Sequence, residues 1–262
     1  MLKNLVYICV ILVLNGCASS ETPNNDISAS GTTSITENIY HWVSLPRPDS
    51  LVIYGVSGRQ VRRDMEIDIA REHAARIIAL YHGVFVTYDT IQHTGSGFLD
   101  FFADSTLTLD YDRAIEKYID RLTFDPERDV IFIDNAVFVR FTYPAVFPAR
   151  LNHAPQPNRN GRPEWTNRPP PMMGDFYTGV GFSGRQVRMK DTITQSYESA
   201  MVSIASQISS VISTSDTTAG YQTQTTVHRR SQGQLSHFTV LELWIDPESL
   251  AVWTLAVARN AR

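Results

Sequence analysis

The chain has 262 residues, of which 23 are basic and 27 acidic, so its formal net charge at pH 7 is −4. A mildly acidic chain lacks the basic surface on which nucleic-acid binding depends, so no nucleic-acid partner is expected. Its two cysteines, Cys9 and Cys17, lie within the first 17 residues. The remainder of the chain therefore has no thiol for a disulfide, a metal site or a nucleophile.

The N-terminus has the layout of a secretory signal. Lys3 precedes a short apolar run over residues 5–14, which is too short to span a hydrocarbon core of about 30 Å. Residues 14–17 read Leu-Asn-Gly-Cys and resemble a bacterial lipobox, although Asn15 stands where a small residue or Val is usual. The resemblance implies that residues 1–16 are a lipoprotein signal peptide and that Cys17 is lipidated. The alternative is an ordinary cleaved signal with an incidental cysteine nearby.

Two segments are expected to lie outside folded domains. Residues 17–40 are rich in Ser, Thr and Asn and contain too little apolar surface to offset the entropy of ordering. They predict a flexible tether with an r.m.s. span of about 25 Å. Residues 144–171 contain eight of the 13 prolines, which disfavour both helix and central strand, and they predict an extended linker.

The segments on either side of this linker are related in sequence. Residues 54–62, YGVSGRQVR, return 126 positions later as residues 180–188, VGFSGRQVR, with seven of nine positions identical. Near the end of each copy, Ile131–Asp134 corresponds to Leu243–Asp246. The match at the fixed offset of 126 positions indicates repeated units, here residues 41–143 and residues 172–262.

Each copy predicts a strand, a Gly-Xaa-Ser-Gly turn and a helix. The strands are expected over residues 51–56 and 176–182. The helices are expected over residues 67–81 and 193–211, where apolar residues recur at steps of three and four.

The remainder of each copy is expected to be mostly β-structure. The first copy predicts a strand over 84–91, a Phe-rich loop over 98–102, an inserted second helix over 111–122 and a long strand over 130–143. In the second copy the predictions are a weak strand over 223–228 and a hairpin of 235–245 with 250–258. The fold class expected is α+β: two related small domains, each with a mixed or antiparallel sheet and one main packed helix.

The order of these features resembles the twenty-kilodalton lipoprotein family of Gram-negative envelopes, which also supplies accessory proteins of the flagellar basal body. The residues that carry the resemblance in the second copy are Trp165, Gly179, Gly181, Ala200, Ala205 and the segment 244–247, Trp-Ile-Asp-Pro. In the first copy the looser matches are Trp42, Gly55, Ala70, Ala74 and Ala79. The resemblance implies a small α/β domain in an outer-membrane lipoprotein without enzymatic activity, and the inserted helix departs from the pattern.

The repeated GxSGRQVR loops are the candidate binding residues. The residues singled out are Gly58, Arg59, Arg62, Gly184, Arg185 and Arg188. In one interpretation they form paired anion or carbohydrate-phosphate sites, with backbone amides at a helix N-terminus and arginine charge. In the other, the glycines supply a positive φ for a tight turn and the arginines are solvated.

No enzymatic chemistry is expected. Gly-Xaa-Ser-Gly lacks the spacing of a nucleophile elbow, so no catalytic residue is assigned. The histidines show no metal-ligand spacing and are expected to be isolated surface residues: His73, His82, His93, His228 and His237. No metal and no cofactor is therefore predicted.

The function expected is that of a lipid-anchored envelope protein with a binding or scaffolding role in the periplasm. Its partners would be the membrane, through the lipid anchor, and another envelope protein. Ala18, rather than Asp, follows the cysteine, which by analogy with the enteric sorting rule favours a periplasm-facing place in the outer membrane. The alternative is an envelope hydrolase or an anion- or carbohydrate-binding protein that uses the paired loops.

Overall fold

The structure is a computed structural model that describes residues 40–95, 101–148, 151, 153–154, 161–219 and 222–261. The signal peptide, Cys17 and all of the tether except Tyr40 lie outside the described residues. From Glu37 onward the chain forms one compact unit. Among the described residues, no helix is long and apolar enough to cross a membrane.

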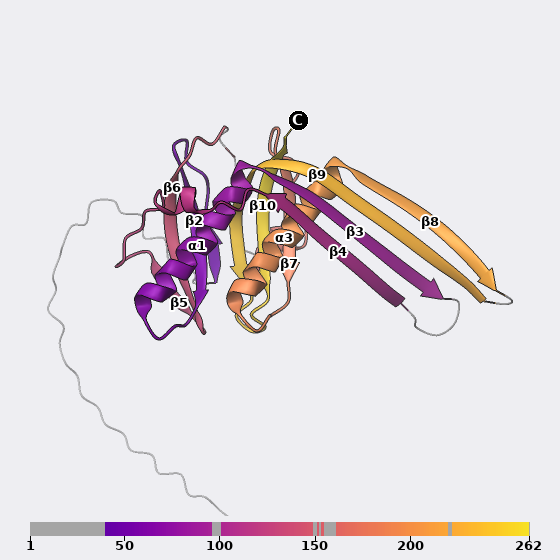
Figure 1. The fold of residues 1–262 in the computed structure, drawn as a ribbon, viewed down its shortest axis with the longest axis horizontal. Helices are drawn as coiled ribbons and strands as arrows, with labels where there is room; N and C mark the ends of the chain where they lie inside the picture. Colours follow the sequence, from indigo (N-terminus) through magenta and orange to yellow (C-terminus); the bar gives the residue numbers. More distant parts are fainter. Residues whose placement is uncertain are drawn as a thin grey trace, which may run out of the picture. The chain divides into compact units, whose positions relative to one another are not determined.

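The described residues of this unit form ten strands and three α-helices with one short 3-10 helix (Figure 1). In chain order these are β1 (His41–Val43), β2 (Ser50–Gly58), α1 (Arg63–His82), β3 (Val84–Gly95), β4 (Phe101–Tyr111), α2 (Glu116–Ile119), β5 (Val130–Ile133), β6 (Ala136–Pro144), η1 (Glu164–Thr166), β7 (Tyr177–Ser183), α3 (Met189–Ile208), β8 (Ser210–Ala219), β9 (Gln222–Ile245) and β10 (Val252–Asn260).

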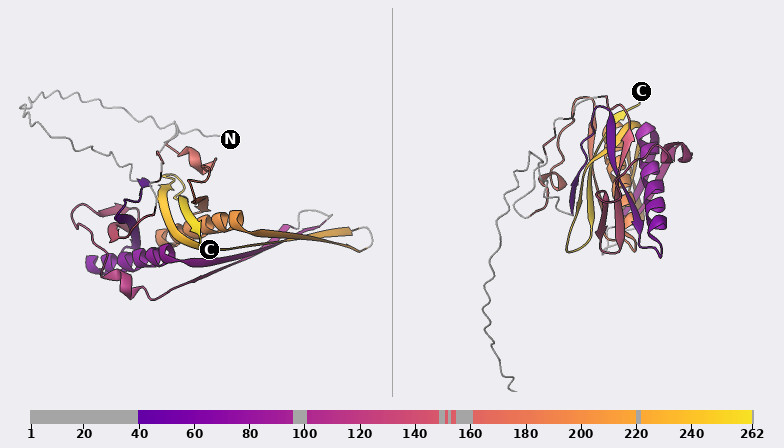
Figure 2. Two further views of the ribbon diagram at one scale, coloured as in Figure 1. Left: turned by 90° about the horizontal axis from the view of Figure 1, so that it is seen from above. Right: turned by 90° about the vertical axis from the view of Figure 1, so that its left-hand side faces the viewer.

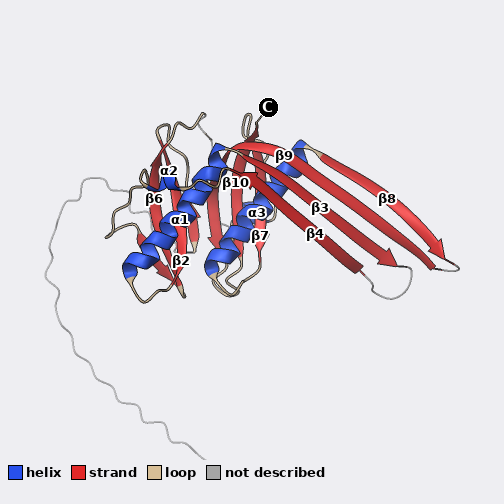
Figure 3. Ribbon diagram, viewed as in Figure 1, coloured by secondary structure: helices blue, strands red, loops and turns tan. Residues whose placement is uncertain are grey.

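The strands form two antiparallel sheets (Figure 3). One has three strands in the order β2-β6-β5, and the other has seven, with the path β4-β3-β9-β10-β7 and with β1 and β8 also paired to β9. This confirms the expected α+β fold with antiparallel sheets. The helices α1 and α3 lie on the same side of the sheets (Figures 1 and 2).

The two repeated segments adopt the same order of elements. In the first, β2 leads into α1 and then pairs with the second strand of the β5-β6 hairpin. In the second, β7 leads into α3 and then pairs with the second strand of the β9-β10 hairpin. The local orders β2-β6-β5 and β7-β10-β9 therefore correspond strand by strand.

Close packing of each helix on its first strand depends on glycine. A Cβ atom at Gly55 would lie 2.0 Å from the carbonyl oxygen of Ala70 in α1, and one at Gly181 would lie 1.9 Å from that of Ser196 in α3. Both pairs are related by the same 126-residue offset as the loops. Small residues at these points let helix and strand backbones approach one another closely.

Each repeat also contributes a long hairpin that follows its helix, β3-β4 in the first and β8-β9 in the second. The two hairpins pair with each other through β3 and β9, over Val84–Gly95 against Gln224–Leu235. The result is a four-stranded ribbon in the order β4-β3-β9-β8 (Figure 1). The seven-stranded sheet therefore contains strands from both predicted domains, and the origin of the chain by duplication stays a prediction.

Some predicted elements were wrong. The inserted helix over 111–122 is reduced to α2, because the alternating segment up to Tyr111 continues β4 and pairs with β3. The strand over 130–143 is interrupted by a turn at Asp134, whose φ is 52°. Residues 223–228 are part of the 24-residue β9 rather than a short strand.

Two further differences concern the ends of elements. The second helix ends at Ile208 instead of residue 211, because Val211 pairs with Arg230 in the ribbon. The linker over 144–171 contains a helical turn in which Trp165 is buried, so this part of the linker packs on the core. The side chains of the Phe-rich loop over 98–102 lie outside the described residues.

Candidate functional site

The two repeated loops, 126 residues apart in the chain, line one cleft. Its volume is about 530 Å³. The residues that line it are Gly58, Arg59, Gln60, Ile69, Glu72, Asp134, Asn135, Arg185, Gln186, Val187, Arg188, Met189, Lys190, Thr192 and Leu250. The cleft thus combines the loop before α1, the loop before α3 and the turn between β5 and β6.

The loops have the same backbone conformation where each helix begins. Arg62 has φ −122° and ψ 135°, and Arg188 has φ −119° and ψ 135°. These extended residues precede the first helical turns without a capping hydrogen bond from their own side chains. The loop sequence therefore sets the same entry into each helix.

Each loop is held by one matching hydrogen bond to its helix. The backbone N–H of Gln60 donates to Oε1 of Glu66 at 2.9 Å. The backbone N–H of Gln186 donates to Oγ1 of Thr192, also at 2.9 Å. Because these two amides already have acceptors, an anion in the cleft would depend mainly on the side chains.

Arg59 is anchored but remains half exposed. Its backbone N–H donates to the carbonyl of Asn135 at 3.1 Å, and its guanidinium lies 3.4 Å from Oε1 of Glu66. The guanidinium carbon is 4.8 Å from the centre of the Phe132 ring. The side chain keeps 53 % of its surface exposed, so its charge is accessible from the cleft.

The arginines of the second loop are held more loosely. Arg185 lies 3.9 Å from Asp134 and its side chain is 64 % exposed, while Arg188 lies 4.0 Å from Asp191. Exposed ion pairs at such distances contribute at most about 1 kcal/mol. Both guanidinium groups can therefore exchange these acids for a ligand at little cost.

The lining of the cleft is basic in an otherwise acidic chain. Four cationic side chains, those of Arg59, Arg185, Arg188 and Lys190, face two carboxylates, those of Glu72 and Asp134. Clefts lined by one sign of charge focus the field and raise the local concentration of ions of the opposite sign. The excess of positive charge favours an anionic ligand.

Only four of the six candidate residues line the cleft. Gly58, Arg59, Arg185 and Arg188 line the cleft, as given above, whereas Arg62 and Gly184 do not. Arg62 instead pairs with Asp64 on the first turn of α1. Sequence reasoning missed Lys190, because nothing in its local pattern shows that the start of α3 faces the other loop.

The prediction that the glycines supply a positive φ was wrong. Gly58 and Gly184 do not have positive φ angles, and a Cβ atom on either would meet nothing within 4 Å. The glycines under steric demand are in the strands: Gly55 and Gly181, each three positions earlier, and also Gly179. Neither the conformation nor the packing of the loops explains why Gly58 and Gly184 recur.

The serines of the two Gly-Xaa-Ser-Gly segments are buried. Ser57 has no exposed surface, and its hydroxyl has no hydrogen-bond partner among the described residues. Ser183 is 2 % exposed and donates to the carbonyl of Gly184 or to the side chain of Gln195. Neither hydroxyl is presented to the cleft beside a general base, which a serine hydrolase would require.

His73 is not a surface residue, contrary to prediction. Its Nδ1 accepts the backbone N–H of Val56 at 3.1 Å, and its Nε2 lies 3.3 Å from the hydroxyl of Thr194 in α3. Burial, followed by the charges of Lys190 and Arg76, lowers its pKa to about 3. His73 therefore joins the two repeats as a neutral imidazole.

The corresponding position in the second repeat has the same role. Ser199, 126 residues after His73, accepts the backbone N–H of Phe182 at 3.3 Å. In both repeats a helix side chain therefore satisfies an N–H on the outer edge of the first strand. This satisfies a donor that an edge strand would otherwise expose.

A second polar cluster surrounds Glu242 near the C-terminal end of β9. Its carboxylate is inaccessible to solvent and accepts hydrogen bonds from His41 at 2.5 Å, from Trp165 at 2.9 Å and from His153. Burial raises the pKa of this carboxyl group, but the bonds from His153, His41 and Trp165 outweigh it and bring the pKa down to about 2. These hydrogen bonds hold β1 and the Pro-rich segment against the core.

The only sequence signal for this cluster was a charged residue between Leu241 and Leu243 in an apolar strand. Within the described residues, no group of three or more His, Cys, Asp or Glu side chains is placed to hold a metal ion. The Glu242 cluster is consequently a structural network with satisfied hydrogen bonds.

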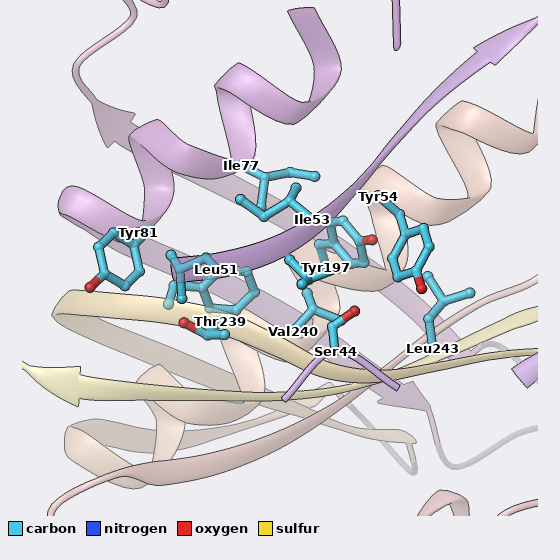
Figure 4. Close-up of a pocket in the computed structure, with 12 residues that line it drawn as sticks. Ser44, Leu51, Ile53, Tyr54, Ile77, Tyr81, Tyr197, Thr239, Val240 and Leu243 are labelled. Carbon is cyan, nitrogen blue, oxygen red and sulfur yellow. The ribbon is translucent and has the colours of Figure 1, made fainter. Parts of the chain in front are cut away.

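A small apolar cavity lies between β2 and β9, under the helices (Figure 4). Its volume is about 20 Å³, and the side chains around it include Ile53, Tyr54, Tyr197 and Leu243. Burial raises the pKa of Tyr197 above its ordinary value. A cavity of this size holds about one water molecule, so it is a packing defect where the two sheets meet and not a ligand site.

Comparison with protein-family models, with curated proteins and with solved structures found no match for this chain.

Proposed function

We propose that this protein binds a small anionic ligand, bearing phosphate or carboxylate groups, in the cleft between its two repeated loops. The observation that carries the proposal is that Arg59 and Arg185, equivalent residues of segments 126 positions apart, line the same cleft. Turn formation alone would not require an arginine at the same position in both loops. A shared binding site accounts for the recurrence of the Arg-Gln pair, since Arg59, Gln60, Arg185 and Gln186 all line the cleft.

The chemistry of the lining supports an anion. Guanidinium groups are planar and present paired N–H donors that match carboxylate and phosphate oxygens. The volume of about 530 Å³ is in the range of small-molecule sites. The guanidinium groups of Arg59 and Arg185 in one cleft can hold one ligand with two anionic groups, or share one group.

The competing function, hydrolysis at the loop serines, receives less support. Ser57 and Ser183 are buried, and the nearby imidazole of His73 has both ring nitrogens engaged with Val56 and Thr194. A binding role needs none of these groups to react. The proposed activity is accordingly binding without covalent chemistry.

We also propose that the protein acts in the cell envelope, held to the outer membrane by lipid on Cys17 and facing the periplasm. The lipobox-like residues 14–17 support this, as does the resemblance to envelope lipoproteins. In this setting the anionic ligand belongs to the envelope or to a partner protein within it. A binding or scaffolding role is supported by the burial of Ser57 and Ser183, which keeps both loop hydroxyls out of the cleft.

The anion site can be tested by isothermal titration calorimetry on the full-length chain in detergent. Inorganic pyrophosphate and citrate, at constant ionic strength, serve as phosphate and carboxylate probes. Arg59→Ala and Arg185→Ala should each weaken binding of the preferred probe by about tenfold or more, since a charged hydrogen bond contributes about 1.5–3 kcal/mol.

Arg62→Ala provides the matched control, because Arg62 belongs to the same loop but lies outside the cleft. It should leave the affinity unchanged. Absence of binding for both probes, or equal weakening by Arg62→Ala, would contradict the proposal. A preference for one probe would identify the charged group that the cleft recognises.

A further inference from the structure

The four-stranded ribbon ends in two strands whose outer edges are unpaired. Among the described residues, β4 pairs only with β3, and β8 pairs only with β9. The two strands have 11 and 10 residues. Each edge therefore presents a long row of backbone N–H and C=O groups that no other strand satisfies.

Both edges lack most of the features that usually prevent pairing with another chain. Natural edge strands are protected by charged side chains, especially lysine, and by proline, bulges or short length. The sequences of β4 and β8 contain no Lys, Arg or Pro, their charged residues are Asp104, Asp110 and Asp216, and their pairing with β3 and β9 continues without a register shift.

Other edges of the molecule are protected. The strand β5 has only four residues, and the outer N–H groups of Val56 in β2 and Phe182 in β7 are bonded to helix side chains. The contrast singles out the two ribbon edges.

The directions of the two edges are complementary. Each neighbouring pair in the order β4-β3-β9-β8 is antiparallel, so β4 and β8 run in opposite directions. When two copies lie side by side with their ribbons aligned, β4 of one copy is therefore antiparallel to β8 of the next. The alternation of strand direction then continues across the contact.

We propose that the protein assembles head to tail with copies of itself, by pairing β4 of one copy with β8 of the next. The contact uses different surfaces on the two copies, so it generates a closed ring or an open filament rather than a two-fold dimer. The proposal does not depend on the anion site, which lies at the loops before α1 and α3.

The register within the ribbon shows which residues would meet. The registers of β4 with β3, β3 with β9 and β9 with β8 can be combined. They place Leu107 of β4 at the same height along the ribbon as Ser210 of β8, and Phe101 at the same height as Asp216. With aligned ribbons, seven residues of each edge therefore face each other. No pair in this register places two charges of the same sign opposite one another.

The same register would cover exposed apolar surface. Val211 and Ile212 at the base of β8 are 65 % and 55 % exposed. In the aligned register they meet Thr106 and Ser105 of the next copy, which are also exposed. Branched aliphatic and hydroxyl side chains are suited to cross-strand contacts in a sheet.

A charge-swap experiment on the full-length chain in detergent tests the proposal, with sedimentation velocity as the measurement. One variant carries Ser105→Lys, Thr106→Lys, Val211→Lys and Ile212→Lys, which opposes like charges at each contact. The matched variant carries the same two β4 changes with Val211→Glu and Ile212→Glu, which opposes unlike charges. Circular dichroism verifies that both variants fold.

The wild-type chain should sediment as an assembly of more than two copies, the all-lysine variant as a monomer, and the lysine–glutamate variant again as an assembly. Symmetric pairing of β4 with β4 or β8 with β8 would instead disperse the lysine–glutamate variant and overturn the head-to-tail arrangement. A monomeric wild type, or an all-lysine variant that stays assembled, would also overturn it. A wild type that is monomeric alone but pairs with a different protein would assign these edges to another partner.

Discussion

Adding one methyl group at Gly55 tests how the repeated strand–helix unit is packed. In Gly55→Ala the new Cβ would lie 2.0 Å from the carbonyl oxygen of Ala70 and 2.9 Å from the ring of Phe141. In the second repeat, Gly181→Ala would place a Cβ 1.9 Å from the carbonyl oxygen of Ser196. Because the obstructing atoms are mainly helix backbone, a change of rotamer cannot relieve these contacts.

The expected cost is large for a single methyl group. Overpacking in a well-packed core costs about 1–3 kcal/mol and sometimes more, and here α1 or α3 must move away from its strand. We therefore expect each of Gly55→Ala and Gly181→Ala to lower the free energy of unfolding by about 3 kcal/mol or more.

Gly58→Ala and Gly184→Ala are the matched controls, since they make the same chemical change three residues further along each repeat. A Cβ at either position meets nothing within 4 Å, and neither glycine has a positive φ. These variants should change the free energy of unfolding by less than about 0.5 kcal/mol, or raise it by up to about 1 kcal/mol by restricting the unfolded chain.

Urea unfolding of the full-length chain, followed by circular dichroism, measures all four variants under one set of conditions. The slope of the transition should be unchanged, so the midpoints report the stability differences. The reasoning would be refuted if Gly58→Ala cost as much as Gly55→Ala, or if both Gly55→Ala and Gly181→Ala were tolerated.

Four other outcomes are expected. The pKa of His73 is about 3 in the folded chain and 6.5 in the unfolded chain, so between pH 3 and 6.5 the unfolded chain binds more protons. The free energy of unfolding should therefore fall by about 2 kcal/mol from pH 6.5 to 5. Urea titrations of His73→Gln should not show this loss. The pKa of Glu242 is lowered from 4.5 to about 2, so its contribution to stability, at most about 3 kcal/mol, is present above pH 4.5 and lost as the pH falls towards 2. Glu242→Gln should be less stable at pH 7, and its free energy of unfolding should fall less steeply with acid in the same assay. Asp134→Asn removes a carboxylate from the cleft and should tighten pyrophosphate binding several-fold by calorimetry, whereas unchanged or weaker binding would count against the electrostatic argument. Cys17→Ser should abolish labelling by radioactive fatty acid and move the protein to the aqueous phase of a detergent extraction, and a wild type already in the aqueous phase would rule out the anchor.

Local pattern was sufficient to predict the main helices and the final hairpin. Apolar residues at steps of three and four identify one buried face over 67–81, and α1 covers this segment. The Asp-Pro-Glu-Ser segment over 246–249 marks the turn between β9 and β10. In these cases the residues that decide the structure are close together in the chain.

The ribbon was predicted only in part, as strands over 84–91 and 223–228. Residues 210–219 of β8 are polar and rich in threonine and serine, and they lack the apolar alternation that marks a half-buried strand. The structure of the ribbon depends on pairing between β3 and β9, whose residues are more than 100 positions apart. The pattern over 111–122 was assigned to a helix because its apolar spacing fits one, although Tyr111 already belongs to β4.

The candidate site was predicted in part. The repeat identified Arg59 and Arg185, but only the tertiary structure shows that they share one cleft. The role of glycine was assigned to the wrong positions, because a sequence does not distinguish a glycine that needs positive φ from one that needs a close backbone contact. The cluster around Glu242 joins residues from three distant segments, and no local sequence pattern predicts it.

The stoichiometry of anion binding tests the central claim most directly, because the claim is that two repeated loops form one site. Calorimetric titration of the full-length chain with pyrophosphate should give one bound anion per chain. Arg59→Ala and Arg185→Ala should each weaken that same binding event. Two independent sites per chain, each lost with only one of the two arginines, or no binding at all, would contradict the account.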